Sequence, residues 1–110
     1  VGYRGICYFL SRDQRSWDQA KAQCLKLGAS LAVLNDREME FLFHLSGKDH
    51  YWLGLHGQDQ RLQWVDGSNF SSSVPLLGNA GCVHLAENVL RSAICSNEMQ
   101  YICSRPQTRL

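Results

Sequence analysis

The sequence lacks the features that mark several large functional classes. It has no apolar run of about 18 residues, the length that a membrane-spanning helix needs, and no signal-peptide pattern. It has no excess of one charge either, because 11 Lys and Arg residues and 10 Asp and Glu residues leave a net charge of +1. This balance argues against nucleic acid or an anionic membrane surface as the partner.

Catalytic and metal-binding motifs are also missing. The chain has no Gly-rich phosphate loop, no nucleophile elbow and no paired carboxylates in a recognisable context. No two cysteines have the close spacing of a zinc ribbon or a redox pair, and the histidines do not have the spacing of a helical zinc-binding pair. We therefore expect no enzyme activity, no metal site and no cofactor. The histidines concerned are His44, His50, His56 and His84.

The sequence has the length of a single domain and is rich in cysteine. We expect all 110 residues, 1–110, to form one domain. Five cysteines without metal-ligand spacing indicate disulfides formed in an oxidising compartment. The odd number leaves one thiol that is free, pairs outside this chain or has its partner in a missing segment, and spacing alone does not select the pairs. These residues are Cys7, Cys24, Cys82, Cys95 and Cys103.

An uncharged run, Tyr51-Trp52-Leu53-Gly54-Leu55, predicts the central buried strand. Gly54 would weaken an isolated strand, so another backbone or a large ring is expected to pack closely against it. Cysteines lie on both sides of this run in the sequence. We therefore expect bridges that tie the two halves of the chain around it.

Capping residues predict where two helices begin. Ser16 and Gln19 form a capping-box pattern for a helix that ends at Gly28, and Asn35 or Asp36 caps a second helix that ends at 47. Other segments are expected to be strands, with a long loop at 66–81 that is functional or mobile and a frayed tail at 104–110. The predicted strands are 3–10, 30–34, 62–65, 82–86, 89–95 and 100–103.

Several of these residues together resemble the C-type lectin-like domain over nearly the whole chain. They are Cys24 in the first helix, the quartet Trp52-Leu53-Gly54-Leu55, Trp64, and Cys82, Cys95 and Cys103. The resemblance implies an α+β fold with two helices flanking antiparallel sheets and a long loop region. It also implies an outer bridge Cys24–Cys103, an inner bridge Cys82–Cys95, and a partner for Cys7 upstream of this chain; a bridge from Cys7 to a second chain is the alternative.

The motifs that bind calcium and sugar in this family are not preserved. Sugar-binding members carry Glu-Pro-Asn or Gln-Pro-Asp in the long loop and Trp-Asn-Asp before the inner-bridge cysteine. This chain has Val74-Pro75-Leu76 and Leu90-Arg91-Ser92 instead. Calcium requires six to eight oxygen ligands, and Arg91 would add a positive charge at the cation position. We expect no calcium-dependent sugar binding there.

Without the calcium site, the start Cys7-Tyr8-Phe9 and the phrase 28–34 resemble the natural-killer receptor group. The chain is similar to the activation-induced lectin-like antigens and the lectin-like transcript ligands. This resemblance implies the extracellular domain of a type II membrane protein of immune cells, with a signal anchor absent from this chain and homodimeric assembly. It would act as ligand or receptor for a natural-killer-type lectin-like receptor. A carbohydrate-binding lectin and a soluble secreted lectin-like protein are the alternatives.

Three groups of residues are predicted to have a role at the surface: a glycosylation site, a dimer contact and a partner-binding surface. Asn69-Phe70-Ser71 is an N-glycosylation sequon. Dimerisation is expected to use the first strand, around Tyr3 to Ile6, and a second helix that is apolar on more than one side, through Met39, Phe41 and Phe43. The residues predicted to bind the partner are Gln58, Asp59, Arg61, His84, Glu87, Asn88, Arg91 and Glu98.

Overall fold

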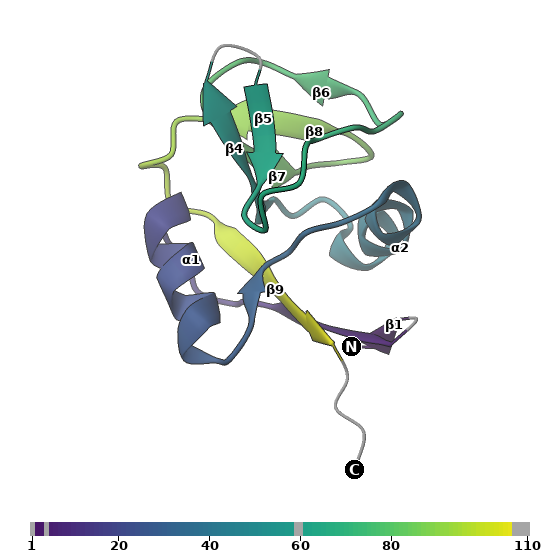
Figure 1. The fold of residues 1–110 in the computed structure, drawn as a ribbon, viewed down its shortest axis with the longest axis vertical. Helices are drawn as coiled ribbons and strands as arrows, with labels where there is room; N and C mark the ends of the chain where they lie inside the picture. Colours follow the sequence, from purple (N-terminus) through teal and green to yellow (C-terminus); the bar gives the residue numbers. More distant parts are fainter. Residues whose placement is uncertain (1, 4, 59–60, 107–110) are drawn as a thin grey trace.

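The computed structural model describes residues 2–3, 5–58 and 61–106, apart from the side chain of Gln58. Helices α1 (Trp17–Lys26) and α2 (Asp36–Ser46) lie on either side of the β2–β9 strand pair (Figure 1). This agrees with the α+β class predicted from the sequence. The described strands are β1 (Gly2–Tyr3), β2 (Ile6–Leu10), β3 (Ser30–Leu31), β4 (Tyr51–Gln58), β5 (Arg61–Trp64), β6 (Leu76–Leu77), β7 (Cys82–Leu85), β8 (Leu90–Ala93) and β9 (Gln100–Pro106).

Both helices begin at complete capping boxes. The Ser16 side chain accepts a hydrogen bond from the Gln19 backbone N–H, and the Gln19 side chain accepts one from the Ser16 N–H. Asn35 and Glu38 make the same reciprocal pair, each at 2.9 Å. These bonds satisfy backbone donors that the first helical turn leaves without partners. The predicted start of the first helix is confirmed, and Asn35 is the cap of the second.

The sheet is mixed, with β4 at its centre. The strand order is β1-β2-β9-β4-β7-β8-β6, while β3 pairs with β9 and β5 with β4. The central strand predicted at 51–55 is confirmed and continues to Gln58. Most pairs are antiparallel, as the resemblance implied, but β4 runs parallel to β9 and β6 runs parallel to β8. In both cases the chain passes through other elements before it returns, as parallel pairing requires.

Gly54 allows two backbone segments to approach β4. Its N–H donates to Ala32 O at 2.8 Å, and its own carbonyl accepts from the Val65 N–H at 2.8 Å. A Cβ at this position would lie 2.6 Å from the carbonyl oxygen of Leu31. The predicted close approach of another backbone is therefore confirmed.

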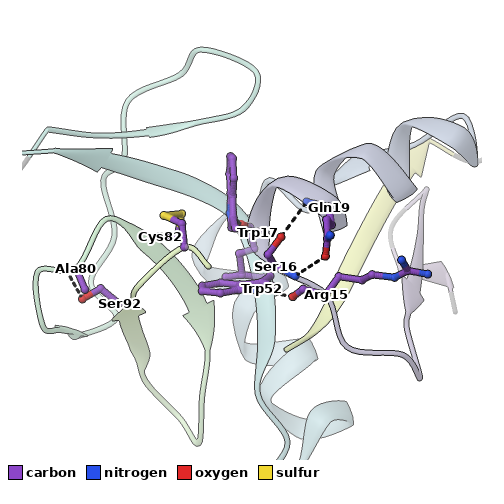
Figure 2. The surroundings of a disulfide bond; sticks show 10 residues. Arg15, Ser16, Trp17, Gln19, Trp52, Ala80, Cys82 and Ser92 are labelled. Atoms are coloured by element: carbon purple, nitrogen blue, oxygen red, sulfur yellow. Dashed lines mark hydrogen bonds between the residues drawn. A yellow bond between two sulfur atoms is a disulfide. The ribbon is translucent and has the colours of Figure 1, made fainter. Parts of the chain in front are cut away.

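Two tryptophans anchor one half of the core through their ring N–H groups. Trp17 Nε1 donates to Leu53 O at 2.8 Å, and Trp52 Nε1 donates to Arg15 O at 2.9 Å (Figure 2). Both indoles are buried in a cluster that also contains three of the disulfide cysteines. Burial of a large ring together with a satisfied N–H stabilises the side chain's position as well as the fold. These contacts hold the start of α1 against β4.

Two disulfides have the pairing that the resemblance implied. Cys24–Cys103 joins α1 to β9 across 79 residues, and Cys82–Cys95 joins β7 to the segment after β8 across 13 residues. Cys7 is the remaining cysteine of the described residues and forms no disulfide. It is half-buried beside a cleft of about 270 Å³ that also touches Phe9. The partner of Cys7 stays a prediction.

Several predicted boundaries shift because pairing with distant strands, which the local pattern does not show, decides where each strand begins and ends. The first strand is divided at Gly5, whose φ of +81° forms the turn between β1 and β2. The predicted strand 30–34 is a strand only at Ser30–Leu31. Residues 57–58 and 61, expected in a turn, belong to the β4–β5 hairpin, and residues 104–106 pair with β2 instead of fraying. The long loop includes the short strand β6.

Candidate functional site

The β7–β8 hairpin carries four of the predicted partner-binding residues, of which all but His84 are exposed. Ala86 N donates to Val89 O at 2.9 Å, which closes a tight turn around Glu87 and Asn88. Asn88 has a φ of 59°, a left-handed conformation that asparagine tolerates better than most residues. Glu87 and Asn88 are exposed at the tip, and Arg91 is exposed on the strand that follows. The structure thus brings Glu87, Asn88 and Arg91 together.

A row of side chains crosses the sheet beside this hairpin. Leu77 of β6 is opposite Arg91 of β8, which is opposite His84 of β7. Residues opposite one another in a sheet share a face, so these three side chains form what we call the outer row. Leu77 is 45% exposed, so an exposed apolar side chain is the cross-strand neighbour of the exposed Arg91.

Sequence reasoning missed Leu77 because its segment was assigned to the long loop. The apolar pair Leu76-Leu77, one half-buried and one exposed, is the signal that could have indicated a short strand. The pair is too short to separate strand from loop by its pattern alone. Only its pairing with β8 settles which side chain faces outward.

His84 is in the core, which corrects its prediction as a surface contact. It is 3% exposed, because the His50 ring stacks on it at 4.9 Å between centroids and the Trp52 ring meets it edge-on at 5.8 Å. Burial lowers the pKa of His84, and the nearby His50 and Arg91 lower it further. His84 is therefore neutral at neutral pH. His84 is therefore the buried end of the outer row, next to Arg91 on the neighbouring strand.

Two further predicted partner residues, Glu98 and Arg61, do not join this group. Glu98 lies in the segment after β8, next to Met99, whose N–H donates to Arg15 O at 2.9 Å. Glu87 and Glu98 are therefore at opposite ends of β8. Arg61 pairs with position 58 at the far end of β4 from the hairpin tip, roughly 20 Å along the strand at about 3.3 Å per residue. Asp59 and the side chain of Gln58 fall outside the described residues.

The long loop is fastened to α2 by one carboxylate. Asp36 Oδ2 accepts hydrogen bonds from the Ser73 N–H at 3.1 Å and the Ser73 hydroxyl at 2.7 Å, and Asp36 Oδ1 accepts one from the Ser72 hydroxyl. The hydroxyl bonds from Ser72 and then Ser73 are the main reason that the pKa of Asp36 is lowered. Earlier in the loop, the Phe70 ring packs against the Trp64 ring, with 6.0 Å between the ring centroids. These contacts fix the loop beside the sheet.

Removing this carboxylate's charge is expected to loosen the loop. In Asp36→Asn, amide hydrogen exchange at Ser73 and Val74 should become roughly ten-fold faster, because charge-assisted bonds to Asp36 worth on the order of 1 kcal/mol are weakened. Asp66→Asn is the matched control, since Asp66 accepts hydrogen bonds within its own turn, from the Ser68 N–H and hydroxyl. Equal exchange in wild type and Asp36→Asn would show that the tether does not hold the loop.

The two segments that replace the calcium motifs lie side by side. Leu90 N donates to Pro75 O at 2.9 Å, and Leu76 is opposite Leu90 in the β6–β8 pair. Next to them is a cleft of about 300 Å³ with an apolar wall and a Gly- and amide-rich rim, at which Ser92 Oγ accepts from Ala80 N at 2.9 Å (Figure 2). Within the described residues, no group of three or more His, Cys, Asp or Glu side chains is placed to hold a metal ion.

The candidate surface is thus an exposed face of the protein. Its charged member Arg91, its apolar member Leu77 and the hairpin tip protrude, while its histidine is buried. Such a surface can make apolar and charge-complementary contacts with another protein. Across residues 2–3, 5–58 and 61–106, neither helix has the length and apolarity needed for a bilayer crossing.

Comparison with known sequences identifies a family. Residues 13–105 match the family model described as Lectin C-type domain. Human early activation antigen CD69 is 33% identical over 108 residues, which cover 96% of this chain and 54% of that protein. Human C-type lectin domain family 2 member B is 32% identical over 107 residues, which cover 96% of this chain and 72% of that protein. The chain therefore spans about half the length of the first of these relatives.

Solved structures share the fold. The mouse scavenger receptor C-type lectin carbohydrate-recognition domain superposes with a TM-score of 0.90 at 21% identity, covering 100% of this chain and 95% of that one. The natural killer cell receptor Ly49C superposes with a TM-score of 0.82 at 23% identity, covering 100% of this chain and 93% of that one. At these identities the likeness concerns the arrangement of the elements alone.

Proposed function

This chain belongs to the C-type lectin domain family, and we propose that it is a protein-recognition domain that binds a lectin-like receptor of the natural-killer type without calcium. The observation that carries the proposal is the outer row. In it, the exposed Arg91 of β8 is opposite Leu77 of β6. These two strands carry parts of the two segments that replace the calcium motifs. A cation site needs several carboxylate or amide oxygens, whereas 74–76 and 90–92 supply apolar groups, one hydroxyl and one guanidinium.

We further propose that the domain is the extracellular, non-enzymatic part of a type II membrane protein of immune cells. The similarity to early activation antigen CD69 supports this setting, as do two disulfides, which persist in oxidising compartments. The membrane would be reached through a segment outside this chain. On this proposal, the outer row and the hairpin tip face the opposing cell.

The test is binding of the multimerised domain to cells that display a panel of natural-killer-type lectin-like receptors, with and without a calcium chelator. We expect one receptor to bind regardless of chelator, and Arg91→Glu to weaken that binding by roughly ten-fold through lost charge complementarity. Arg37→Glu is the matched control, because Arg37 is exposed on α2, away from the outer row. Binding that requires cell-surface glycans and disappears with chelator would favour the carbohydrate-binding alternative and overturn this proposal.

The two segments predicted to dimerise meet in the structure, which supports a homodimer. The Tyr3 ring of β1 stacks on Phe41 of α2 at 4.3 Å between centroids and an interplanar angle of 16°. β1 is at the edge of the sheet, where its backbone can pair with another strand. Ile6 and Phe43 are half-buried nearby, but Met39 is 1% exposed and belongs to the core. Met39 therefore cannot contact a second copy, which corrects that prediction.

A charge at this meeting point is expected to separate the dimer. In Phe41→Glu, the dimer dissociation constant should rise at least roughly ten-fold, because a desolvated carboxylate replaces an apolar contact. Sedimentation velocity measures the change, and circular dichroism checks that the monomer stays folded. Phe9→Glu is the control, since Phe9 is an exposed aromatic on β2 away from α2. An unchanged sedimentation mass for Phe41→Glu would count against this interface.

A further inference from the structure

The glycosylation sequon lies along β5 as if it were a further short strand. Asn69 forms an antiparallel bridge with Gln63, and the backbone bonds Trp64 N to Ser68 O at 3.0 Å and Phe70 N to Leu62 O at 3.3 Å flank it. Phe70 turns inward to pack against Trp64. Because successive residues in extended backbone point to opposite sides, Asn69 points outward, and it is exposed.

The same alternation decides which β5 residues share the face of Asn69. Leu62 and Trp64 face the core, while Arg61 and Gln63 are exposed. Bridge partners lie on one face, so Asn69 shares its face with Gln63 and, two residues along the strand, with Arg61. These residues line a shallow hollow of about 540 Å³ together with Leu62 and Phe70. The sequon therefore opens onto a surface that holds one of the predicted partner-binding arginines.

We propose that an N-linked glycan on Asn69 occupies this hollow and screens Arg61 and the β5 face from protein partners, which directs recognition to the outer row and the β7–β8 hairpin. The first N-acetylglucosamine units offer hydroxyl and amide oxygens to the Arg61 guanidinium, which has only donors. Leu62 and Phe70 also line the hollow and add an apolar part to it. The second half of the proposal rests on the proposed receptor binding, whereas the screening itself does not.

The screening can be tested without any receptor. The domain, secreted from mammalian cells, is treated with the arginine reagent phenylglyoxal, and labelling is followed by peptide mass spectrometry at Arg61 and, as an internal reference, at Arg91. Ser71→Ala removes the sequon without changing Asn69, and Ser71→Thr is the matched variant that keeps it. We expect Arg61 to react several-fold more slowly in wild type and Ser71→Thr than in Ser71→Ala, with Arg91 labelled equally in all three. An unglycosylated Asn69 in wild type, or equal labelling of Arg61 in all three, would overturn the proposal.

Receptor binding then tests the second half separately. Affinity for the receptor found in the cell panel should be the same for Ser71→Ala and Ser71→Thr, because the contacted surface lies elsewhere. A change in affinity on loss of the glycan would show that the partner reaches the β5 face and would overturn the directing role. If labelling shows screening but no receptor in the panel binds, the proposed function fails while the glycan's placement stands.

Discussion

Gly54→Ala is expected to destabilise the domain by roughly 3 to 4 kcal/mol, although it adds only one methyl group. The added Cβ would lie 2.6 Å from the Leu31 carbonyl oxygen and 2.9 Å from Val65 Cγ2. Overpacking of this kind costs about 1 to 3 kcal/mol, and movement of the strand would strain two backbone hydrogen bonds of Gly54, each worth about 1 kcal/mol. The Leu31 backbone has little room to yield, because β3 pairs with β9 beside the outer disulfide.

Urea denaturation of Gly54→Ala against wild type measures this loss. Gly28→Ala is the control for the general cost of replacing a glycine, since Gly28 has a φ of +71° and nothing within 4 Å of its would-be Cβ. That variant should lose about 1 kcal/mol, the cost of a left-handed conformation for an ordinary residue. A Gly54→Ala loss no larger than that of Gly28→Ala would mean that β3 and β4 can move apart at little cost.

The second large effect is expected from removing the outer disulfide. The double variant Cys24→Ala/Cys103→Ala should lose about 4 to 5 kcal/mol, because the bond closes a loop of 79 residues and restricts the unfolded chain accordingly. Removing the inner bridge, with a separation of 13 residues, should cost about 3 kcal/mol on the same reasoning. Alanine is preferred to serine because Cys24 and Cys103 are buried, and a serine would bring an unsatisfied hydroxyl into the core.

The comparison of the two bridges is the informative measurement. Chemical denaturation of Cys24→Ala/Cys103→Ala, Cys82→Ala/Cys95→Ala and the control Cys7→Ala should give losses that decrease in this order. Cys7 forms no disulfide among the described residues, so its replacement should leave the free energy of unfolding nearly unchanged. Equal losses for the two double variants would show that loop length does not govern the stabilisation.

Features set by neighbouring residues could be predicted from the sequence. The capping pair Ser16 and Gln19 is three residues apart, and Gly54 stands out within an apolar run, so both patterns are local. The disulfide pairing was available only through the resemblance to a known domain. Spacing alone left the five cysteines without assigned partners.

Features set by long-range pairing were missed. His84 was placed on the surface because a polar residue in a short strand has no local sign of which face it occupies, and a one-residue difference in register reverses the answer. Met39 shares a helix with exposed residues, and only packing shows that it is core. The tether from Asp36 to Ser72 and Ser73 joins positions 36 and 37 residues apart, which leaves no local pattern to detect.

The β2–β9 pair also decides how the domain would respond to mechanical force. The N-terminal strands β1 and β2 lie at the end of the molecule where the chain also leaves β9, away from β5 and β8 (Figure 1). On the proposed function, a pull between an N-terminal anchor and a partner on the β7–β8 hairpin would first load the short β1–β2 pair and then the β2–β9 hydrogen bonds, from Ile6 opposite Pro106 towards Leu10 opposite Ile102. Beyond them, Cys24–Cys103 would carry the tension covalently into β9. The bridge would therefore limit extension under load to the residues before Cys24, and on the proposed function it would leave the β7–β8 hairpin folded while its contact is pulled.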